Sequence, residues 1–573
     1  MKRFLEYLFV CVFVVFSSSC NIDGEITTTL PPKIVLDSQT GIYTVKQGRE
    51  ITISPSYKSA DGAKYSWTME GEVVCTSASL SFKGNEPGQH FITIAITTDG
   101  GSDEEEIRID VIELEIPTVS IAGNKHQTVA VGTTINFTAS VRATSLPTTL
   151  EWDVNGTSVG NEPTYTFNAD AVGSYTITAT ASNEDGTHCD KIDIEVLNAD
   201  DMPLVWEFDR TTYHTVAGRK LLIAPSTHNS DEGISYSWQL AGKAEPQGND
   251  ARFVFTAETA GEYQITATAT TEKDGGLITI THEFNITVYE AGAFYRAKSA
   301  VSKADWNKVY EYTPAPGQFI NELKTGGFNA SHINPEAAVA YAEDRLNNNI
   351  WVSLGGFGGY VVVGFDHSIT NTRGYDLGVV GNAFDGSSEP GVVWVMQDEN
   401  GNGFPDDTWY ELAGSETGKV ETYRDYAVTY YRPTGTGMPV QWTDNYGNTG
   451  EVDYLEQFHD QDYYYPLWIG ADSYTLTGTR LEARNYDQSG NGTYWVNPHY
   501  DWGYVDNFSP TDFNSSDMAN LFNISNAIDF EGNPVKLNHI DFVKVQCAVN
   551  AKSGWLGEIS TEVCGFYDYS LKK

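Results

Sequence analysis

The chain has 573 residues, which is too long for a single hydrophobic core, so several domains are expected. Hydrophobic residues make up 40% and aromatic residues 13% of the sequence, a composition that belongs to globular proteins and excludes a largely disordered chain. The formal net charge of −42 argues against binding to nucleic acid or adsorption to an anionic lipid surface, since both require clustered Lys and Arg.

The N-terminus has the pattern of a secretion signal. Lys2 and Arg3 precede a mostly apolar run over residues 5–16, which is too short for a membrane span. Residues 17–20, Ser-Ser-Ser-Cys, resemble a bacterial lipobox, which implies a signal peptide over residues 1–19 and lipidation of Cys20. Ordinary signal cleavage that leaves a free Cys20 is the alternative.

Two acidic residues shortly after the cysteine indicate where the protein is sent. Asp23 and Glu25 resemble the acidic signal that directs lipoproteins of Bacteroidetes to the cell surface. This resemblance implies a protein on the outer face of the outer membrane, which touches the membrane only through its acyl chains. Residues 20–32 then form the lipidated N-terminus and a polar spacer.

A unit of roughly 85–90 residues then occurs three times. Each copy has a Trp within a predicted strand, namely Trp67, Trp152 and Trp238. Each also has a Gly turn followed by strict alternation of apolar and polar residues, which predicts a half-buried strand; these segments are residues 88–94, 173–179 and 261–267. The ring two residues after the Gly is predicted to form a structural corner; it is His90, Tyr175 or Tyr263.

The unit length, the inner-strand Trp and the many short strands predict β-sandwiches of the immunoglobulin type over residues 33–115, 116–199 and 200–290. The Gly-x-Tyr-x-Ile-x-Ala pattern, as in residues 173–179, resembles PKD-like repeats of bacterial surface proteins. The usual inter-sheet cysteine pair and the Gly-Asp-Gly that often follows the Trp in PKD domains are absent, which leaves PKD-like and general Ig-like sandwiches open. Each Trp is predicted to be core, and the three sandwiches to act as a stiff spacer.

Residues 291–573 are predicted to form a larger, jelly-roll-like β-sandwich, so that the whole chain is all-β. Nine of the 13 Trp and 23 of the 33 Tyr lie at or after residue 293, more than a sandwich core needs. A short helix is expected over Pro335–Asn347, with Asn334 as its N-cap. The expected strands include Tyr360–Phe365, Leu377–Val380, Val392–Met396, Ile540–Val549 and Gly557–Gly565.

Two long loops of this domain are candidates for a binding surface. Residues 460–468 read DQDYYYPLW and residues 492–507 read GTYWVNPHYDWGYVDN, which mixes rings with Asp, Asn and His. Such loops on a rigid sandwich often carry binding residues. The predicted ligand contacts are Tyr463, Tyr464, Trp468, Tyr494, Trp495 and Trp502. The alternative is a flap that packs on the sandwich itself.

The run from Asp398 to Asp407 predicts a structural Ca²⁺ site. Hard cations prefer oxygen ligands on a tightly curled backbone, and the predicted ligands are Asp398, Asn400, Asn402, Asp406 and Asp407. The first three match the Asp-x-Asn-x-Asn-Gly pattern of the calcium loops in EF-hands, dockerins and thrombospondin-type repeats. The twelfth position departs from that pattern, because it is Trp409 and not Glu. A plain Asn-Gly turn without a cation is the alternative.

Catalysis and a disulfide have less support. Neither Gly-x-Ser-x-Gly nor His-Glu-x-x-His occurs. A glycosidase needs two carboxylates at a cleft, and the candidates in this domain are Asp376, Glu389, Asp501, Glu558 and Glu562. Cys547 and Cys564 flank a turn, and their spacing leaves a disulfide open.

Several C-terminal motifs resemble a family of Bacteroidetes cell-surface lipoproteins that carry PKD-like repeats. They are GFDH at 364–367, GNAF at 381–384, SEPGVVWV at 388–395, DENGNG at 398–403, WGYVDN at 502–507 and DFVKVQ at 541–546. The resemblance implies a nutrient-uptake setting. We expect the C-terminal domain to capture a glycan or a corrinoid and pass it to an outer-membrane transporter, with no nucleic acid involved. The alternatives are a polysaccharide hydrolase and an adhesin or structural surface protein.

Overall fold

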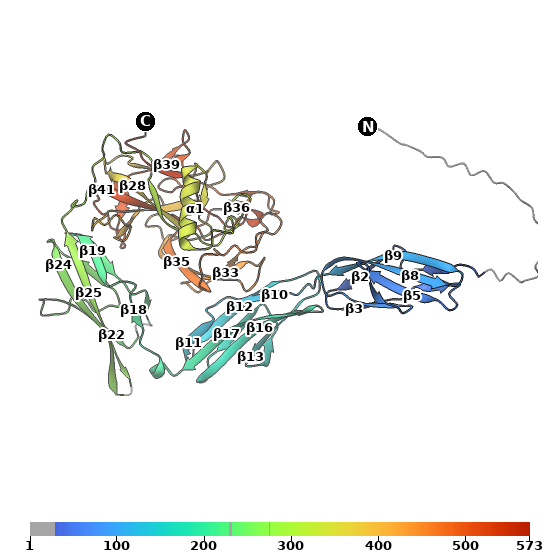
Figure 1. Cartoon of the computed structure of the whole chain (residues 1–573). Coiled ribbons are helices and arrows are strands. Elements are labelled where there is room, and N and C mark those ends of the chain that lie inside the picture. Colours follow the sequence, from blue (N-terminus) through green and yellow to red (C-terminus); the bar gives the residue numbers. More distant parts are fainter. Residues whose placement is uncertain (1–28, 229–231, 274, 573) are drawn as a thin grey trace, which may run out of the picture. The chain divides into compact units, whose positions relative to one another are not determined.

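The structure is a computed structural model that describes residues 29–228, 232–273 and 275–572. The predicted signal peptide and Cys20 lie outside the described residues. The chain divides into two compact units at Glu115 and Ile116. Apart from α1 (Pro335–Asn347) and short 3-10 turns, the regular structure of the described residues is β, which confirms the predicted all-β class (Figure 1).

The first sandwich is built around a five-stranded sheet of order β2-β9-β8-β5-β6. Its strands are β2 (Ile42–Lys46), β5 (Lys64–Met69), β6 (Glu72–Cys75), β8 (Gly88–Thr98) and β9 (Gly101–Ile112). Two antiparallel pairs complete it: β1 (Lys33–Val35) with β4 (Ser56–Lys58), and β3 (Glu50–Ile53) with β7 (Leu80–Lys83). Apolar side chains from both groups of strands share one core.

The second sandwich has the same plan. Its larger sheet has the order β11-β17-β16-β13-β14, with β11 (His126–Ala130), β13 (Thr149–Val154), β14 (Thr157–Gly160), β16 (Gly173–Asn183) and β17 (Gly186–Leu197). Its smaller sheet has the order β10-β12-β15, with β10 (Thr118–Ile121), β12 (Thr134–Arg142) and β15 (Thr164–Asn168).

The third sandwich has a four-stranded sheet of order β19-β25-β24-β22, with β19 (Thr212–Val216), β22 (Ile234–Leu240), β24 (Gly261–Lys273) and β25 (Gly276–Tyr289). Two pairs complete it: β18 (Trp206–Glu207) with β21 (Thr227–His228), and β20 (Lys220–Ile223) with β23 (Phe253–Thr256). In each of the three sandwiches an early strand runs parallel to the last one, as β2–β9, β11–β17 and β19–β25 do.

The repeated Trp is core in every copy, as predicted. Trp67, Trp152 and Trp238 are each 0% exposed. Each indole N–H also donates to a backbone carbonyl, at 2.8–2.9 Å, and the acceptors are the carbonyl oxygens of Ser77, Glu162 and Asp250. The Trp therefore fills the core and closes a loop at the same time.

The predicted structural corner is also present in every copy. The side chains of His90, Tyr175 and Tyr263 each bond to the carbonyl oxygen four residues earlier, at 2.9–3.0 Å. This contact ties the turn before the strand to the strand itself, which explains why a ring with a polar tip recurs there.

The C-terminal domain has two main antiparallel sheets around one core. The larger has the order β26-β28-β41-β30-β31-β40, with β26 (Lys308–Thr313), β28 (Tyr360–Thr370), β41 (His539–Cys547), β30 (Gly391–Met396), β31 (Trp409–Leu412) and β40 (Ala527–Ile528). The smaller has the order β38-β39-β29-β43, with β38 (Phe513–Asn514), β39 (Ala519–Phe522), β29 (Leu377–Val380) and β43 (Gly565–Asp568). Valines from β28, β30 and β41 meet apolar residues of β29, β39 and β43 between them.

Further elements cover this sandwich. A third sheet has the order β34-β33-β32-β35 and its own aromatic core, with β32 (Tyr423–Tyr431), β33 (Val440–Asp444), β34 (Thr449–Val452) and β35 (Ser473–Arg480). Two short pairs lie at the edges: β27 (Val352–Ser353) with β42 (Glu562–Val563), and β36 (Tyr486–Asp487) with β37 (Trp495–Val496). The helix α1 contacts β26. Asn334 caps it as predicted, because its side chain accepts the Ala337 N–H at 2.9 Å.

One predicted strand is wrong. Residues 557–565 form β42 and the first residue of β43, but not one continuous strand. Backbone groups of this segment form hydrogen bonds that do not belong to a continuous β-ladder. The Glu562 N–H donates to the Asp506 carboxylate at 2.9 Å, and the Thr561 carbonyl accepts the Leu354 N–H at 3.0 Å. The cysteines near this segment, Cys547 and Cys564, are both free thiols and form no disulfide.

Candidate functional site

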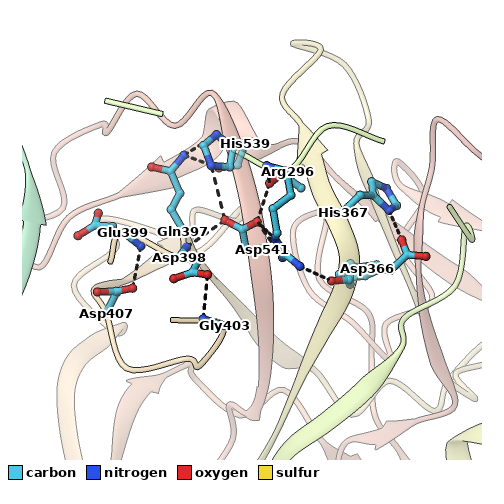
Figure 2. A network of polar contacts seen from close by, with 12 residues as sticks. Arg296, Asp366, His367, Gln397, Asp398, Glu399, Gly403, Asp407, His539 and Asp541 are labelled. Atoms are coloured by element: carbon cyan, nitrogen blue, oxygen red, sulfur yellow. Dashed lines mark hydrogen bonds and ion pairs between the residues drawn. The ribbon is translucent and has the colours of Figure 1, made fainter. Parts of the chain in front are cut away.

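The loop between β30 and β31 carries the five predicted metal-ligand side chains. Its first residue, Asp398, curls the backbone: its carboxylate accepts the N–H of Gly403 at 3.0 Å (Figure 2). It also accepts the N–H of Asn402 at 3.1 Å. Gly401 and Gly403 have φ of 72° and 77°, a left-handed conformation that favours glycine. The sequence Asn-Gly-Asn-Gly therefore allows the tight curl.

The other four predicted ligands close the loop. The Asn400 amide donates to Asp406 at 3.1 Å and to Asp407 at 3.3 Å, and the Asn402 amide donates to Asp406 at 2.9 Å. The second Asp407 oxygen accepts the Glu399 N–H at 2.7 Å. Each of the five side chains carries an oxygen atom, which is the donor that Ca²⁺ prefers.

The electrostatics of the loop also suit a cation. Burial raises the pKa of Asp398. Burial, followed by the neighbouring Glu399, raises the pKa of Asp407 to about 8. Glu399 itself forms an ion pair with Arg219 of the third sandwich, at 2.5 Å. Burial raises the pKa of Glu399 to about 7, and Arg219 acts in the opposite direction. Crowded carboxylates with raised pKa values gain from a divalent ion, so the charges of this loop would favour Ca²⁺, and the site stays a prediction.

A buried carboxylate that the sequence did not single out supports this loop. Asp541 on β41 is 0% exposed and accepts the Asp398 N–H at 2.9 Å (Figure 2). Arg296 and Ser368 hold its other oxygen, at 2.9 and 2.6 Å. The sequence offered one sign of this role, an Asp at the start of an otherwise apolar strand. A buried carboxylate requires hydrogen-bond partners, so an Asp at such a position predicts a local polar network.

A Ca²⁺-dependent stability is expected for this loop. Adding Ca²⁺ to EDTA-treated protein should stabilise the C-terminal domain by about 2.7 kcal/mol at a hundred times the dissociation constant. Asp398→Asn should remove most of this gain, because it removes a charged ligand. The measurement is thermal unfolding of the mature chain with Ca²⁺ or EDTA.

The control for that experiment is Asp385→Asn, which neutralises an exposed carboxylate outside the loop. It should respond to Ca²⁺ as the native protein does. An equal response in both variants, or no response in the native protein, would leave only a hydrogen-bonded turn.

Two of the six predicted ligand contacts are core residues, which corrects the prediction for them. Tyr464 is 0% exposed, and its hydroxyl donates to the His459 carbonyl at 2.9 Å. Trp468 is 7% exposed and stacks on Phe328, with ring centroids 5.6 Å apart. The DQDYYYPLW segment thus packs its rings inward, as the self-packed alternative proposed.

The other four rings lie nearer the surface. Tyr463 is half-buried, and its carbonyl accepts the Asn321 amide at 2.9 Å. Tyr494 is 60% exposed. Trp495 is half-buried against Gly554, where an added Cβ would lie 2.3 Å from the indole nitrogen. The structure does not gather these rings into one surface with Trp502.

Trp502 lines a pocket of about 330 Å³. Its aromatic lining residues are Tyr375, which is 38% exposed, Trp502, which is 36% exposed, and Phe522, which is buried in the core. Leu412, Asp512, Asn523 and Asn526 contribute apolar and polar atoms. Asp512 is fully used by the fold, since it accepts the Gly503 N–H at 2.6 Å and the Asn520 amide at 3.2 Å. The pocket therefore offers two half-exposed rings and two asparagine side chains to a ligand.

Three carboxylates meet elsewhere in the domain. Oxygen atoms of Glu389, Asp506 and Glu562 lie within 4.8 Å of one another. Burial and mutual repulsion raise the pKa of Glu389 to about 8, and burial raises that of Asp506 to about 7. The pKa of Glu562 is also raised, by burial and then by the other two carboxylates. The cluster therefore keeps protons at pH values at which isolated carboxyl groups have lost theirs.

This carboxylate cluster is poorly placed for hydrolysis. Asp506 is 1% and Glu562 4% exposed, so a polysaccharide cannot reach either carboxylate. Glu389 and Glu562 were among the carboxylates that the sequence offered for a glycosidase, but Asp506 was not. Its only distinguishing sign was its place in the WGYVDN motif. Of the other candidates, Asp376 is 1% exposed and bonded to Thr372 at 2.6 Å.

Two family models match the N-terminal part of the chain. Residues 31–98 match a PKD-like domain, and residues 118–196 match a PKD domain. The chain thus carries two PKD-like domains, in agreement with its repeat pattern. Such domains are typical of surface or adhesion-type proteins. No helix among the described residues combines the length and apolar character needed to cross a bilayer.

Solved structures show partial similarity. The fibronectin(III)-like modules of Clostridium thermocellum CbhA are 17% identical, with 30% of this chain and 97% of that chain covered and a TM-score of 0.18. Three N-terminal domains of the bacteriophage RB49 outer capsid protein Hoc are 14% identical, with 45% of this chain and 99% of that chain covered and a TM-score of 0.19. The titin I-band fragment I67–I69 is 13% identical, with 45% of this chain and 98% of that chain covered and a TM-score of 0.20. A search of curated proteins gives no match. The function must therefore be argued from the chain's own residues.

Proposed function

We propose that this is a surface-exposed outer-membrane lipoprotein whose C-terminal domain captures an extracellular glycan. The N-terminal sandwiches act as the spacer, and Cys20 as the lipid anchor. The observation that carries the proposal is the pocket between Tyr375 and Trp502, where rings can stack on a sugar face and asparagine amides can bond to hydroxyls.

The size of the pocket favours a glycan over a corrinoid. A cavity of about 330 Å³ is at the small end of ligand pockets and suits a sugar ring, whereas a corrin macrocycle with its side chains is far larger. An outer-membrane transporter remains the proposed partner that would receive the captured ligand.

An adhesin or structural surface protein is the second candidate. It is favoured by the matched PKD-like domains, which occur in surface and adhesion-type proteins. On this reading the C-terminal domain would bind a surface without any transfer to a transporter. The two candidates differ in whether a soluble oligosaccharide binds the mature chain.

Trp502→Ala is expected to weaken glycan binding about five- to thirty-fold, because stacking on one ring contributes on the order of 1–2 kcal/mol. The measurement is a glycan array with the mature chain, followed by calorimetry with the best oligosaccharide. Trp555→Ala is the matched control, since Trp555 is 47% exposed and lies outside the pocket. Equal loss in both variants, or none in Trp502→Ala, would contradict the proposal. Release of shortened product would indicate the hydrolase.

A further inference from the structure

A lysine lies in the middle of the larger sheet of the C-terminal domain. Lys544 is on β41, between β28 and β30, and its neighbours Val543 and Val545 are both 0% exposed in the core. Because side chains alternate along a strand, Lys544 projects from the opposite face of the sheet. Its register partners are Val362 on β28 and Trp394 on β30.

The ammonium group of Lys544 is surrounded by rings. Its Nζ lies 5.0 Å from the ring centroid of Trp394, 5.1 Å from that of Trp409 and 5.6 Å from that of Tyr360. Within the part of the chain that the structure describes, no ion pair joins this lysine to a carboxylate. The positive charge is therefore balanced only by aromatic faces and by more distant acids.

The environment of Lys544 makes that charge costly. Burial lowers the pKa of Lys544 to about 8, while Glu311 and Glu411 act in the opposite direction. Glu411 is already committed, since it accepts bonds from Thr479 at 2.7 Å and Arg424 at 3.4 Å. Because no carboxylate among the described residues lies close to the Lys544 ammonium group, that group is free to pair with a bound anion.

The Lys544 side chain lies at a groove on the surface of the domain. Lys544 lines a cavity of about 550 Å³ between the larger sheet and β35. Tyr360 and Trp409 contribute half-buried rings, and Thr475, Thr477 and Glu311 contribute hydroxyl and carboxylate groups. The groove shares no lining residue with the Trp502 pocket, so the two are separate sites.

We propose that this groove binds a small saccharide that carries one carboxylate, a hexuronate or a chain end of that type. The carboxylate pairs with Lys544 Nζ, and one sugar face stacks on Trp409 or Tyr360. Hydroxyl groups bond to the side chains of Thr475 and Thr477. A long polyanion does not fit, because the chain as a whole carries a net charge of −42. The saccharide part of this assignment rests on the proposed glycan function, whereas the anion site does not.

The test is calorimetry of the mature chain with D-glucuronate and D-galacturonate, each beside its neutral hexose. At least one uronate should bind, and its neutral counterpart should bind at least about ten-fold more weakly, the range expected for a charge-assisted bond. Lys544→Met keeps the length and apolar stem of the side chain and should cost a similar factor. Lys544→Arg keeps the charge and should therefore bind the uronate more tightly than Lys544→Met does.

Two further variants separate this site from its neighbours. Glu311→Gln removes a negative charge from the rim and should tighten uronate binding, which a purely structural lysine would not explain. Trp502→Ala should leave uronate binding unchanged, so failure of the Trp502 pocket and failure of this groove can be told apart. No uronate binding, equal binding by Lys544→Met, or equally tight binding of inorganic phosphate would overturn the proposal.

Discussion

Trp152→Ala is expected to destabilise the second sandwich by about 4–6 kcal/mol. The side chain is 0% exposed at the centre of the core, and truncation of a buried Trp costs about 3–5 kcal/mol. The change also removes the donor that the Glu162 carbonyl accepts at 2.8 Å, which adds about 1 kcal/mol. Domains of this size have a free energy of unfolding of about 5–15 kcal/mol, so the loss can unfold the sandwich.

The measurement is urea unfolding combined with limited proteolysis of the mature chain. Trp152→Phe separates the two contributions, because it keeps most of the apolar volume but loses the N–H. Val159→Ala is the control, since Val159 is 41% exposed on the same sandwich and should change stability little. A Trp152→Ala protein within about 1 kcal/mol of the native stability would show that the ring is not the centre of the core.

Raising the pH from 6 to 8 is expected to destabilise the C-terminal domain by roughly 3 kcal/mol, through the carboxylate cluster. The native pKa values of Glu389 and Asp506, about 8 and about 7, are above their ordinary values, and that of Glu562 is raised as well. Between pH 5 and 8 the native state therefore holds more protons than the unfolded chain. Each such proton lowers stability by up to about 1.4 kcal/mol for every pH unit of increase.

Thermal unfolding in EDTA at several pH values measures this effect. Glu562→Gln should flatten the pH dependence, because it replaces one ionisable side chain by a neutral one of the same shape. Glu421→Gln, which changes an exposed carboxylate of the same domain, should leave the slope unaltered. A stability that rises with pH when Ca²⁺ is present, and does so also in Asp398→Asn, would mean that the cluster holds a cation instead of protons.

The sequence was informative where the signal is local. Alternation after a Gly turn predicted the strands that carry Tyr175 and Tyr263, and the repeated Trp predicted the cores. The helix after Asn334 followed from one cap and one proline. These features depend on residues within a few positions of each other, so tertiary packing did not have to be known.

The sequence was less informative about rings and charges. Tyr464 and Trp468 looked like ligand contacts because aromatic residues were dense, but density does not distinguish a core ring from a surface ring. The carboxylates of Asp506 and Glu562, and the rings around Lys544, come together only when distant strands pair. For Lys544 the one available sign was a charged residue within the DFVKVQ strand.

The parallel pairing in each sandwich has a mechanical consequence. In the second sandwich, β11 and β17 run parallel over five residue pairs, from His126–Asp193 to Ala130–Leu197. The chain enters through β10, which precedes β11, and leaves at the end of β17. Tension on the two ends of such a unit pulls these strands past one another, so their hydrogen bonds carry the load together and must rupture together. A unit of this type therefore resists stretching through its parallel pair of strands, while the turns between its inner strands bear almost no force.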